Sequence, residues 1–380
     1  MRIWGITGTN GKTTVTWILA EFLKAAYITT VEVNTTRRVF STGYTTPPLP
    51  VLKDIFAEME ASGVRDCVME VSSHAIHQRR TGDTVFAGGA FTNLSEDHLD
   101  YHKTMENYFQ AKFLFAERLA EGRAARPDDG RRDMPPFVVC LDGGCGYKML
   151  EAAGALPLNV IPVSVKAPRY DLSGLKLAGE YNKSNVLVAA ALAEAAGVPR
   201  EEIQRIIPLL RPRWGRMEEV ASRSKARVFV DFAHTPDGLE KVLGAARGFT
   251  CGKLWAVFGA GGDRDRTKRT LMGEAAAKEA DCLVVTSDNP RSEEPLEIIE
   301  EIMAGVRRAV SDASRITVEP DRAKAISYAL SNAAEDDVVL ICGKGHETTQ
   351  EIKGVKYPFD DREIVRRYVN PMKRGENEIK

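Results

Sequence analysis

The sequence predicts an α/β protein with two doubly wound domains. Short apolar runs alternate with helical patterns along the whole chain, a glycine-rich loop follows the first run, and Pro208 and Pro212 interrupt the pattern midway. Such runs are typical of buried parallel strands, and sheets of this kind bind ligands at the carboxyl ends of their strands. We therefore expect two domains, residues 1–211 and residues 212–380.

The composition narrows the function classes. The chain has 380 residues, of which 43% are hydrophobic and 28% charged, and its formal net charge is -1. These values favour neither nucleic acid nor a membrane surface as a partner. No apolar stretch reaches the roughly 18 residues of a membrane helix, and no signal peptide pattern opens the chain, so we expect a cytoplasmic protein. The six scattered cysteines indicate reduced core residues, with a Cys140–Cys145 metal or redox pair as the lesser alternative.

The first expected elements are a strand at Ile3–Ile6, a phosphate-binding loop and a helix over Val15–Lys24. Glycine lets the loop turn its N–H groups toward an oxyanion, lysine adds positive charge, and a threonine hydroxyl can hold Mg²⁺. The helix N-terminus also favours an anion. Ile6 replaces a glycine of the strict motif, which leaves an accidental glycine-rich turn as the alternative. The residues expected to contact ATP here are Gly8, Thr9, Asn10, Gly11, Lys12, Thr13 and Thr14.

The later elements follow in order from the same patterns. Strands are expected at six apolar runs, 67–69, 137–140, 228–230, 254–258, 283–285 and 338–342. Helical spacing predicts helices that include 105–119, 271–278 and 296–310. The segment 122–136 is rich in Arg, Asp and Pro, and we interpret it as a surface loop.

Polar motifs follow several of these strands. Glu70 comes just after a buried strand, where a carboxylate suits Mg²⁺, and the loop 92–102 holds two histidines and three acids. The later motifs are Gly179–Asn185, Gly215–Glu218, Asp231–Asp237, Gly261–Arg264, Asp288–Arg291 and Gly343–Glu347. In this order the motifs resemble those of the Mur ligases, and within that family the tripeptide synthetase branch. The resemblance runs from Ile3 to about Asp361.

The resemblance implies an ATP-dependent carboxylate–amine ligase. Its expected architecture is a P-loop ATPase-like central domain and a Rossmann-like C-terminal domain, hinged near 211–216 with the chemistry in the cleft between them. In that family the acceptor carboxylate attacks the γ-phosphate, and the incoming amine then displaces phosphate from the acyl phosphate. Clustered positive charge in a water-poor cleft lets the two anions approach each other.

The resemblance implies catalytic roles for four residues. Lys12 would hold the phosphates with the loop amides, and Thr13 and Glu70 would bind a first Mg²⁺. His98 would bind a second Mg²⁺, together with a carbamate formed from Lys112 and CO₂. The alternatives are a locally hydrogen-bonded loop histidine for His98 and an ordinary surface lysine for Lys112.

The second half is expected to close the nucleotide site. By resemblance, the residues that would contact ATP there are Asn182, Arg216, Asp231 and His234. Asp231 and His234 could equally cap the helix that follows them, because short polar side chains are common at that position.

The incoming amino acid is expected to be meso-diaminopimelate. The residues that match the family's amino-acid site are Arg264, Asp288, Asn289, Arg291, Gly343 and Glu347. Arg291 could bind the distal carboxylate through two hydrogen bonds, and Glu347 could take the distal ammonium. Lysine lacks that carboxylate and would leave the arginine unpaired, so lysine is the lesser alternative. Arg291 could instead pair with Glu293 or Glu294.

Acceptor binding carries the open alternatives. The residues that match the family's acceptor site are Thr45, Thr46, Ser72, Gln78 and Arg80, and Arg80 would pair with an acidic acceptor. The family's N-terminal uridine-binding domain has no counterpart here, and the stretches 25–28 and 165–179 look shortened. Three interpretations follow. In the first, the chain is a tripeptide synthetase core with a separate acceptor-binding domain or subunit. In the second, it is a ligase for an acceptor without a nucleotide. In the third, it is a catalytically idle partner subunit.

Overall fold

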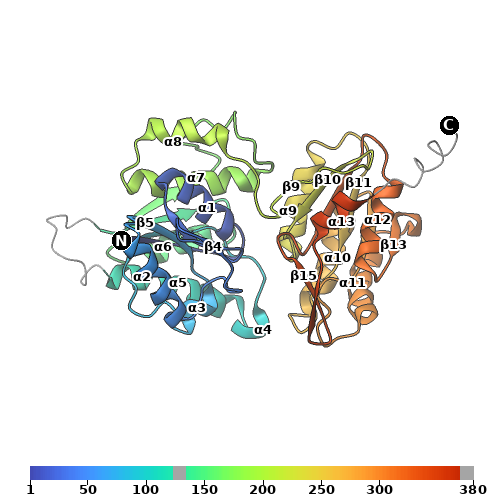
Figure 1. Ribbon diagram of the computed structural model, residues 1–380, viewed down its shortest axis with the longest axis horizontal. Coiled ribbons are helices and arrows are strands. Elements are labelled where there is room, and N and C mark those ends of the chain that lie inside the picture. Colours follow the sequence, from blue (N-terminus) through green and yellow to red (C-terminus); the bar gives the residue numbers. More distant parts are fainter. Residues whose placement is uncertain (123–133, 369–380) are drawn as a thin grey trace. The chain divides into compact units, whose positions relative to one another are not determined.

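The computed structural model describes residues 1–122 and 134–368. Contacts divide the chain into two units, Met1–Leu210 and Arg211–Lys380 (Figure 1). Each unit contains a mainly parallel sheet covered by helices on both faces, which confirms the predicted α/β class. The surface loop predicted at 122–136 falls mainly on residues 123–133, outside the described residues. Within the described ranges, no helix has the length and apolar character needed to cross a membrane.

Unit 1 is built on an eight-stranded sheet in the order β4-β3-β2-β5-β1-β6-β7-β8. In this spatial order, β2, β5, β1, β6, β7 and β8 run parallel to one another. At one edge, β3 pairs antiparallel with both β2 and β4. The bounds are β1 (Arg2–Thr7), β2 (Ala26–Ile28), β3 (Val33–Asn34), β4 (Val39–Phe40), β5 (Asp66–Glu70), β6 (Phe86–Phe91), β7 (Pro136–Cys140) and β8 (Asn159–Val163).

The helices of unit 1 form two layers. Helices α1, α7 and α8 lie on one face of the sheet, and α2, α5 and α6 lie on the other (Figure 1). The bounds are α1 (Lys12–Leu23), α2 (Leu49–Ala61), α3 (Ser73–His77), α4 (Leu99–His102), α5 (Met105–Glu121), α6 (Gly146–Gly154), α7 (Glu180–Ala195) and α8 (Arg200–Ile206), with a 3₁₀ turn at Ile207–Leu209.

Unit 2 contains a six-stranded sheet in the order β13-β12-β11-β14-β10-β9, in which only β9 is antiparallel to its neighbour. A separate hairpin, β15–β16, follows the last parallel strand. The strands are β9 (Glu218–Glu219), β10 (Arg227–Asp231), β11 (Leu254–Phe258), β12 (Cys282–Val285), β13 (Ile316–Val318), β14 (Val338–Cys342), β15 (Thr349–Ile352) and β16 (Val355–Pro358).

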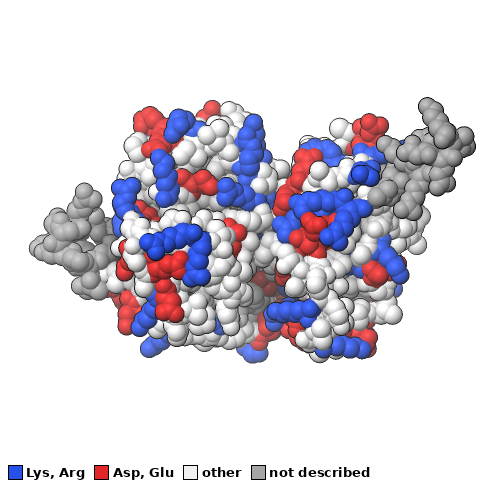
Figure 2. Space-filling view, viewed as in Figure 1, with Lys and Arg blue, Asp and Glu red and all other residues white. Residues whose placement is uncertain are grey.

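The helices of unit 2 also cover both faces. Helices α12 and α13 pack on the apolar cluster formed by β10, β11 and β14, and α9, α10 and α11 cover the other face (Figure 1). The bounds are α9 (Pro236–Arg247), α10 (Thr267–Glu279), α11 (Pro295–Ala309), α12 (Arg322–Asn332) and α13 (Asp361–Arg367), with a 3₁₀ turn at Ala313–Arg315. On the face drawn in Figure 2, acidic and basic side chains are interspersed over both units.

Every predicted strand is present, but several short antiparallel strands were not predicted. Strands β3, β4 and β9 have two residues each, too few to show an alternating pattern. The turn after α1 is also tighter than the sequence suggested: Lys24 closes the helix with a φ of 51°, and Ala26–Ile28 already belong to strand β2. The second shortened stretch, residues 164–179, contains neither helix nor strand.

Candidate active site

The phosphate-binding loop joins β1 to α1, and the segment after β6 supports it. Gly8 has a φ of 148° and Gly11 a φ of 84°, conformations that other residues rarely adopt. A Cβ on Gly8 would lie 1.9 Å from Thr92 Oγ1, and one on Gly11 would lie 2.4 Å from Asn185 Oδ1. Both positions therefore require glycine. The loop ends at the N-terminus of α1, which is a favourable position for an anion.

Glu70 lies beside this loop at the carboxyl end of β5 and is 1% exposed. Its Oε1 accepts hydrogen bonds from Thr13 Oγ1 and from the Thr30 N–H, each at 2.8 Å, and its Oε2 accepts one from Thr30 Oγ1 at 3.1 Å. The Lys12 ammonium donates to two carbonyls of the loop at 3.0 and 2.8 Å. The carboxylate and the hydroxyl thus meet at the end of β5, and the ammonium belongs to the loop that follows the neighbouring strand β1. This set suits Mg²⁺ bound to a phosphate.

Three of the predicted acceptor residues gather around Glu70. Thr45 Oγ1 lies 3.0 Å from Thr30 Oγ1, which contacts the carboxylate. Thr46 Oγ1 donates to the Glu70 carbonyl at 2.9 Å and accepts from the Ser72 N–H at 3.0 Å. The hydroxyl groups therefore line the segment between β5 and α3, next to the phosphate-binding loop.

Gln78 and Arg80 follow the short helix α3. Arg80 Nε donates to Gln78 Oε1 at 2.9 Å, and the Arg80 guanidinium lies 5.8 Å from the centre of the Tyr44 ring. Gln78 is exposed and Arg80 half-buried, so the arginine keeps a surface from which it can bind an anion.

Lys112 is a buried residue, so the alternative of a surface lysine is wrong. The core-facing positions of α5 include Tyr108, Lys112, Phe115 and Leu119, and this spacing places the lysine on the inner face of the helix. Its side chain is 1% exposed, and its Nζ donates to the Gly8 carbonyl at 2.8 Å. Burial lowers the pKa of Lys112 well below its ordinary value. The neutral amine is the form that reacts with CO₂.

Tyr108 connects Lys112 to the phosphate-binding loop. The tyrosine hydroxyl lies 3.2 Å from Thr9 Oγ1, and the Lys112 Nζ lies 4.5 Å from the centre of the Tyr108 ring. The ring stacks on His102 with centres 4.9 Å apart. Tyr108 itself is 1% exposed, so these contacts occur in the interior of unit 1.

His98 belongs to a cluster of histidine and tyrosine rings after β6. It precedes α4 with a φ of 55°, and its ring centre lies 4.9 Å from that of His74. The local contact considered as an alternative is present: His98 Nε2 lies 3.5 Å from Asp97 Oδ2. Burial lowers the pKa of His98 despite the opposing Asp97, and neutral imidazole is the form that binds a metal ion.

The predicted metal ligands do not form a complete protein cage. Among the described residues, no group of three or more His, Cys, Asp or Glu side chains is arranged to hold a metal ion. Magnesium sites in phosphate-transfer proteins commonly use one or two carboxylates, with phosphate and water as the other ligands. The Thr13–Glu70 pair fits that kind of site.

The N-terminal end of α7 lies against the phosphate-binding loop. Asn182, which is 7% exposed, donates from Nδ2 to the Ala178 carbonyl at 2.7 Å. Its Oδ1 accepts from Asn185 Nδ2 at 3.2 Å, and Asn185 Oδ1 is the atom closest to a Cβ built on Gly11. This contact therefore connects Asn182, which is predicted to contact ATP, to the phosphate-binding loop within unit 1.

In unit 2, Asp231 ends strand β10 and is 5% exposed. Its carboxylate accepts from the Met217 and Ala233 N–H groups, each at 2.7 Å, and burial raises its pKa. The alternative in which Asp231 and His234 cap the next helix is wrong. Thr235 caps α9, and the His234 Nδ1 lies 2.8 Å from the Phe232 carbonyl. The Arg216 guanidinium lies 4.6 Å from the centre of the Phe232 ring.

Arg291 does not pair with Glu293 or Glu294, which contradicts the alternative derived from the sequence. Its Nη1 donates to the Gly262 carbonyl at 2.6 Å, and its Nε lies 3.7 Å from Glu351 Oε2. Its φ is 52°, and its backbone bonds to the hairpin segment that contains Glu351. Glu294 pairs instead with Lys353 at 3.0 Å.

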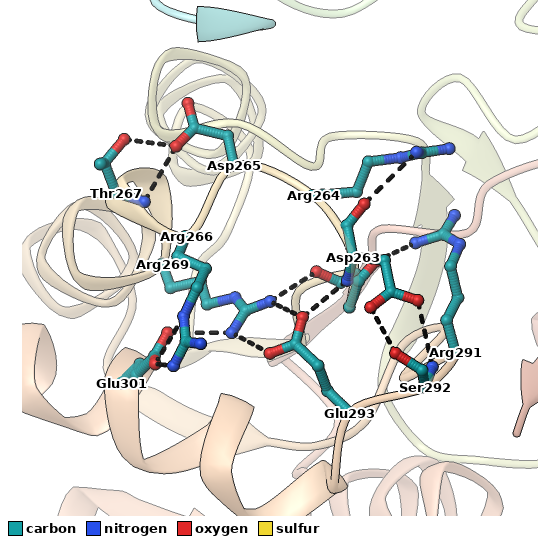
Figure 3. Close-up of polar contacts among 12 residues, drawn as sticks. Asp263, Arg264, Asp265, Arg266, Thr267, Arg269, Arg291, Ser292, Glu293 and Glu301 are labelled. Carbon is teal, nitrogen blue, oxygen red and sulfur yellow. Dashed lines mark hydrogen bonds and ion pairs between the residues drawn. The ribbon is translucent and has the colours of Figure 1, made fainter. Parts of the chain in front are cut away.

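Hydrogen bonds and an ion pair hold the Arg291 loop against α10 and the loop before it (Figure 3). Ser292 donates to the Asp263 carboxylate from Oγ at 2.6 Å and from its N–H at 3.2 Å. Glu293 accepts from Arg269 at 2.7 and 2.8 Å, and Arg269 has a fully buried side chain. Arg264 and Arg291 both flank Gly261, and their guanidinium groups lie on the same side of the Asp263 loop in Figure 3.

Asn289 and Glu347 form one network with Lys344, a residue that the sequence reasoning missed. Asn289 Nδ2 donates to Glu347 Oε2 at 2.8 Å. Lys344 Nζ donates to Asn289 Oδ1 and to Glu347 Oε2, each at 3.0 Å. Asp288 is 8% exposed, and its Oδ2 would lie 2.5 Å from a Cβ on Gly343. The six predicted amino-acid residues thus come from loops at the carboxyl ends of β11, β12 and β14.

The sequence reasoning also missed Thr30 and Tyr108. Thr30 sits at a strand end, which is a usable signal, but only the fold places it against Glu70. Tyr108 lies one helical turn before Lys112, and that spacing could have indicated a shared inner face.

Comparisons with known proteins agree with this geometry. Residues 6–131 match the sequence model of the Mur ligase middle domain, and residues 215–345 match that of the Mur ligase, glutamate ligase domain. Two curated relatives are named UDP-N-acetylmuramoyl-L-alanyl-D-glutamate–2,6-diaminopimelate ligase. The relative from Aquifex aeolicus is 41% identical over 377 residues, covering 96% of this chain and 77% of the relative. The relative from Synechococcus elongatus is 42% identical over 382 residues, covering 96% and 76%.

Solved structures show the same fold. A solved structure with the same ligase name is 32% identical in sequence and superposes with a TM-score of 0.59. The match covers 96% of this chain and 77% of the chain in that structure. A pseudomurein peptide ligase type C from Methanothermus fervidus has a TM-score of 0.63 at 16% identity, covering 90% of this chain and 76% of its own.

Proposed function

The chain belongs to the Mur ligase family, and from this premise we propose that it is an ATP-dependent ligase that joins meso-diaminopimelate to the D-glutamate carboxylate of UDP-N-acetylmuramoyl-L-alanyl-D-glutamate. The observation that carries the proposal is the hydrogen bond between Thr13 and Glu70 at the end of β5, beside the phosphate-binding loop that contains Lys12. A ligase of this kind needs a triphosphate site beside a site for a second anion, and the acceptor residues Thr45, Thr46 and Ser72 adjoin that strand end.

The phosphate side is assigned to unit 1. Lys12 and the N–H groups at the start of α1 would hold the triphosphate, and Thr13 and Glu70 would hold Mg²⁺. The metal ion, when bound, neutralises charge on the phosphates and so lowers the barrier to attack by an anion. Lys12 contributes a fixed positive charge in the same place. The acceptor carboxylate then attacks the γ-phosphorus, ADP leaves, and an acyl phosphate forms.

Lys112 is the candidate for modification. Its amine is buried and its pKa is lowered, so more of it is neutral than in an exposed lysine, and the neutral amine can add to CO₂ to give a carbamate and a proton. The carbamate would supply a negative oxygen donor on the inner face of α5, on the same side as His98, and these two residues would hold the second metal ion. The carbamate nitrogen keeps one N–H, so the hydrogen bond from Nζ to the Gly8 carbonyl can persist after modification.

The amine side is assigned to unit 2. Arg291 binds the distal carboxylate of diaminopimelate, and Glu347, which Asn289 holds in place, binds its distal ammonium. Arg264 stands beside Arg291 and adds positive charge for a carboxylate. The free amine at the other end attacks the acyl phosphate, phosphate leaves, and the lost proton passes to solvent.

Phosphate release with defined substrates tests this proposal. The protein is mixed with ATP, Mg²⁺ and diaminopimelate, and either the nucleotide-linked acceptor or the bare L-alanyl-D-glutamate dipeptide is added. We expect release only when acceptor and amino acid are both present, a clear preference for the nucleotide-linked acceptor, and a product whose mass equals the sum of the two minus water.

The alternatives give different results. Equal or faster use of the bare dipeptide would contradict the proposed acceptor and indicate a ligase for an acceptor without a nucleotide. No release with either acceptor, in protein that still binds ATP, would contradict ligase activity and favour an idle partner.

A further inference from the structure

Lys344 is a fully buried cation in the proposed amino-acid site. It follows β14, its side chain has no exposed area, and its Nζ contacts Asn289 and Glu347, each at 3.0 Å. A buried ammonium needs a compensating charge, and Glu347 provides it. The pair occupies one oxygen of the carboxylate, Oε2, which also accepts from Asn289 Nδ2 at 2.8 Å.

The same contacts fix the orientation of the Asn289 amide. Its Oδ1 accepts from Lys344 and from the Glu351 N–H at 2.9 Å, so its Nδ2 must face Glu347. The Glu351 backbone carbonyl in turn accepts from the Arg291 N–H at 3.0 Å. One continuous network thus connects the buried lysine to the arginine that selects a distal carboxylate.

The charges in this network decide which amino acid the site accepts. Lys344 and Glu347 cancel each other, and Glu351 lies 3.7 Å from Arg291, so neither carboxylate adds an uncompensated negative charge to the site. The distal end of diaminopimelate carries both a carboxylate and an ammonium and is neutral as a whole. The distal end of lysine carries only an ammonium, so the neutralised Glu347 gives it no net attraction.

We propose that Lys344 is a specificity-determining residue: by neutralising Glu347, it makes the site select an amino acid with a zwitterionic distal end over one with a bare ammonium. This inference rests on the proposed function of the same site. It assigns the rejection of lysine to a residue that need not contact the substrate, because Lys344 acts through Glu347 and Asn289.

Calorimetric binding of diaminopimelate and of lysine to the full chain tests the inference, and turnover is measured in parallel. Lys344→Met removes the charge and keeps an unbranched side chain of similar length. We expect the preference for diaminopimelate, taken as the ratio of the two Kd values, to fall about tenfold or more, because the uncompensated Glu347 then attracts the bare ammonium of lysine. Glu347→Gln leaves Lys344 uncompensated, so the preference should rise.

Lys353→Met is the matched control, because this lysine is 69% exposed and pairs with Glu294 on the neighbouring surface. The Lys353→Met variant should show the same preference for diaminopimelate over lysine as the wild type. A purely structural role for Lys344 would weaken the binding of both amino acids by the same factor, and that result would overturn the inference. A preference that shifts in the same direction in Lys344→Met and Glu347→Gln would overturn it as well.

The fold of each variant is checked by circular dichroism, and Glu347→Gln decides the question alone if Lys344→Met does not fold. In that case an unchanged or lowered preference in Glu347→Gln would overturn the inference. A wild-type protein that binds diaminopimelate but forms no product would contradict the proposed function, and the binding ratios would still decide the role of Lys344.

Discussion

The phosphate side in unit 1 and the amino-acid side in unit 2 are built in different ways. The phosphate-binding loop is one continuous segment whose shape follows from Gly8 and Gly11. The Arg291 loop takes its shape from charged residues far away in the chain, above all Arg269, which bridges Glu293 and Glu301. A local backbone constraint appears in a motif, whereas an ion-pair network appears only in three dimensions.

This difference predicts separable effects of mutation. Changes in the loop of unit 1 should abolish the chemical step and leave the fold intact. Changes in the charged network of unit 2 should alter stability and substrate choice before they alter the chemical step.

The largest expected effect is that of Lys12→Met. The variant loses the positive charge beside the phosphates, so kcat should fall by about a thousandfold or more. The lysine is half-buried and donates to two carbonyls of its own loop, so the thermal midpoint should change little. Lys24→Met, at a lysine that is 77% exposed, serves as control and should keep full activity. A Lys12→Met variant with near-normal turnover would contradict the assignment of the phosphate side.

The second effect concerns Lys112. If a carbamate forms there, Lys112→Ala should lower kcat about a hundredfold or more, and added acetate should restore part of the activity by placing a carboxylate in the vacated space. Labelled bicarbonate should give a carbamate carbon signal in the wild type and none in the variant. Full loss of activity with no carbamate signal in the wild type would indicate that Lys112 acts as the unmodified amine.

The third effect is a loss of stability in unit 2. Arg269→Met leaves Glu293 and Glu301 without their buried partner, and we expect the free energy of unfolding to fall by about 2–4 kcal/mol, less than for a fully buried pair because Glu301 is 29% exposed. Denaturant titration measures this change. Arg307→Met removes an exposed pair with Glu300 on α11 and should leave the midpoint unchanged. Equal losses in both variants would contradict the special role of the network.

The fourth effect is a pH dependence of the stability of unit 2, which arises from the same Arg269 network. Hydrogen bonds from Arg269 lower the pKa of Glu293 to about 2 from its ordinary 4.5. A lowered pKa means that the ionised group stabilises the fold above pH 4.5, and that this contribution is lost as the pH falls from 4.5 toward 2. Glu293→Gln should therefore flatten the fall in stability between these values, as measured by acid titration of the unfolding midpoint. An unchanged acid profile would contradict the assignment.

The smallest effect is expected for Tyr108→Phe. The variant loses the hydroxyl contact with Thr9 and keeps the ring that covers Lys112 and stacks on His102. One neutral hydrogen bond contributes about 1 kcal/mol, so the KM for ATP should rise about fivefold while kcat stays close to that of the wild type. A large fall in kcat would instead show that the hydroxyl takes part in the chemical step.

The sequence predicted the fold class and those parallel strands whose apolar runs are continuous. It did not predict β6 and β8, whose apolar runs are interrupted by glycine and by proline. It predicted the phosphate-binding loop for a related reason, since glycine positions and the lysine lie within eight consecutive residues. These features depend on neighbours in the chain, and a single sequence shows them directly.

The partners of the site residues could not be predicted in the same way. Lys344 and Asn289 are 55 residues apart, and Thr30 and Glu70 are 40 apart. Asp231 looked like a helix cap, but the fold directs its carboxylate to the Met217 and Ala233 N–H groups. Lys112 looked like a surface residue, although its spacing from Tyr108 and Phe115 places it on the inner face of α5.

Transfer of labelled oxygen from the acceptor tests the proposed chemistry most directly. The D-glutamate carboxylate of the acceptor is labelled with heavy oxygen, and the phosphate released with ATP and diaminopimelate is analysed by mass spectrometry. The acyl-phosphate route predicts one labelled oxygen in each released phosphate, and no release without acceptor. Unlabelled phosphate would mean that water attacks ATP, and it would contradict the assignment of this protein as a ligase.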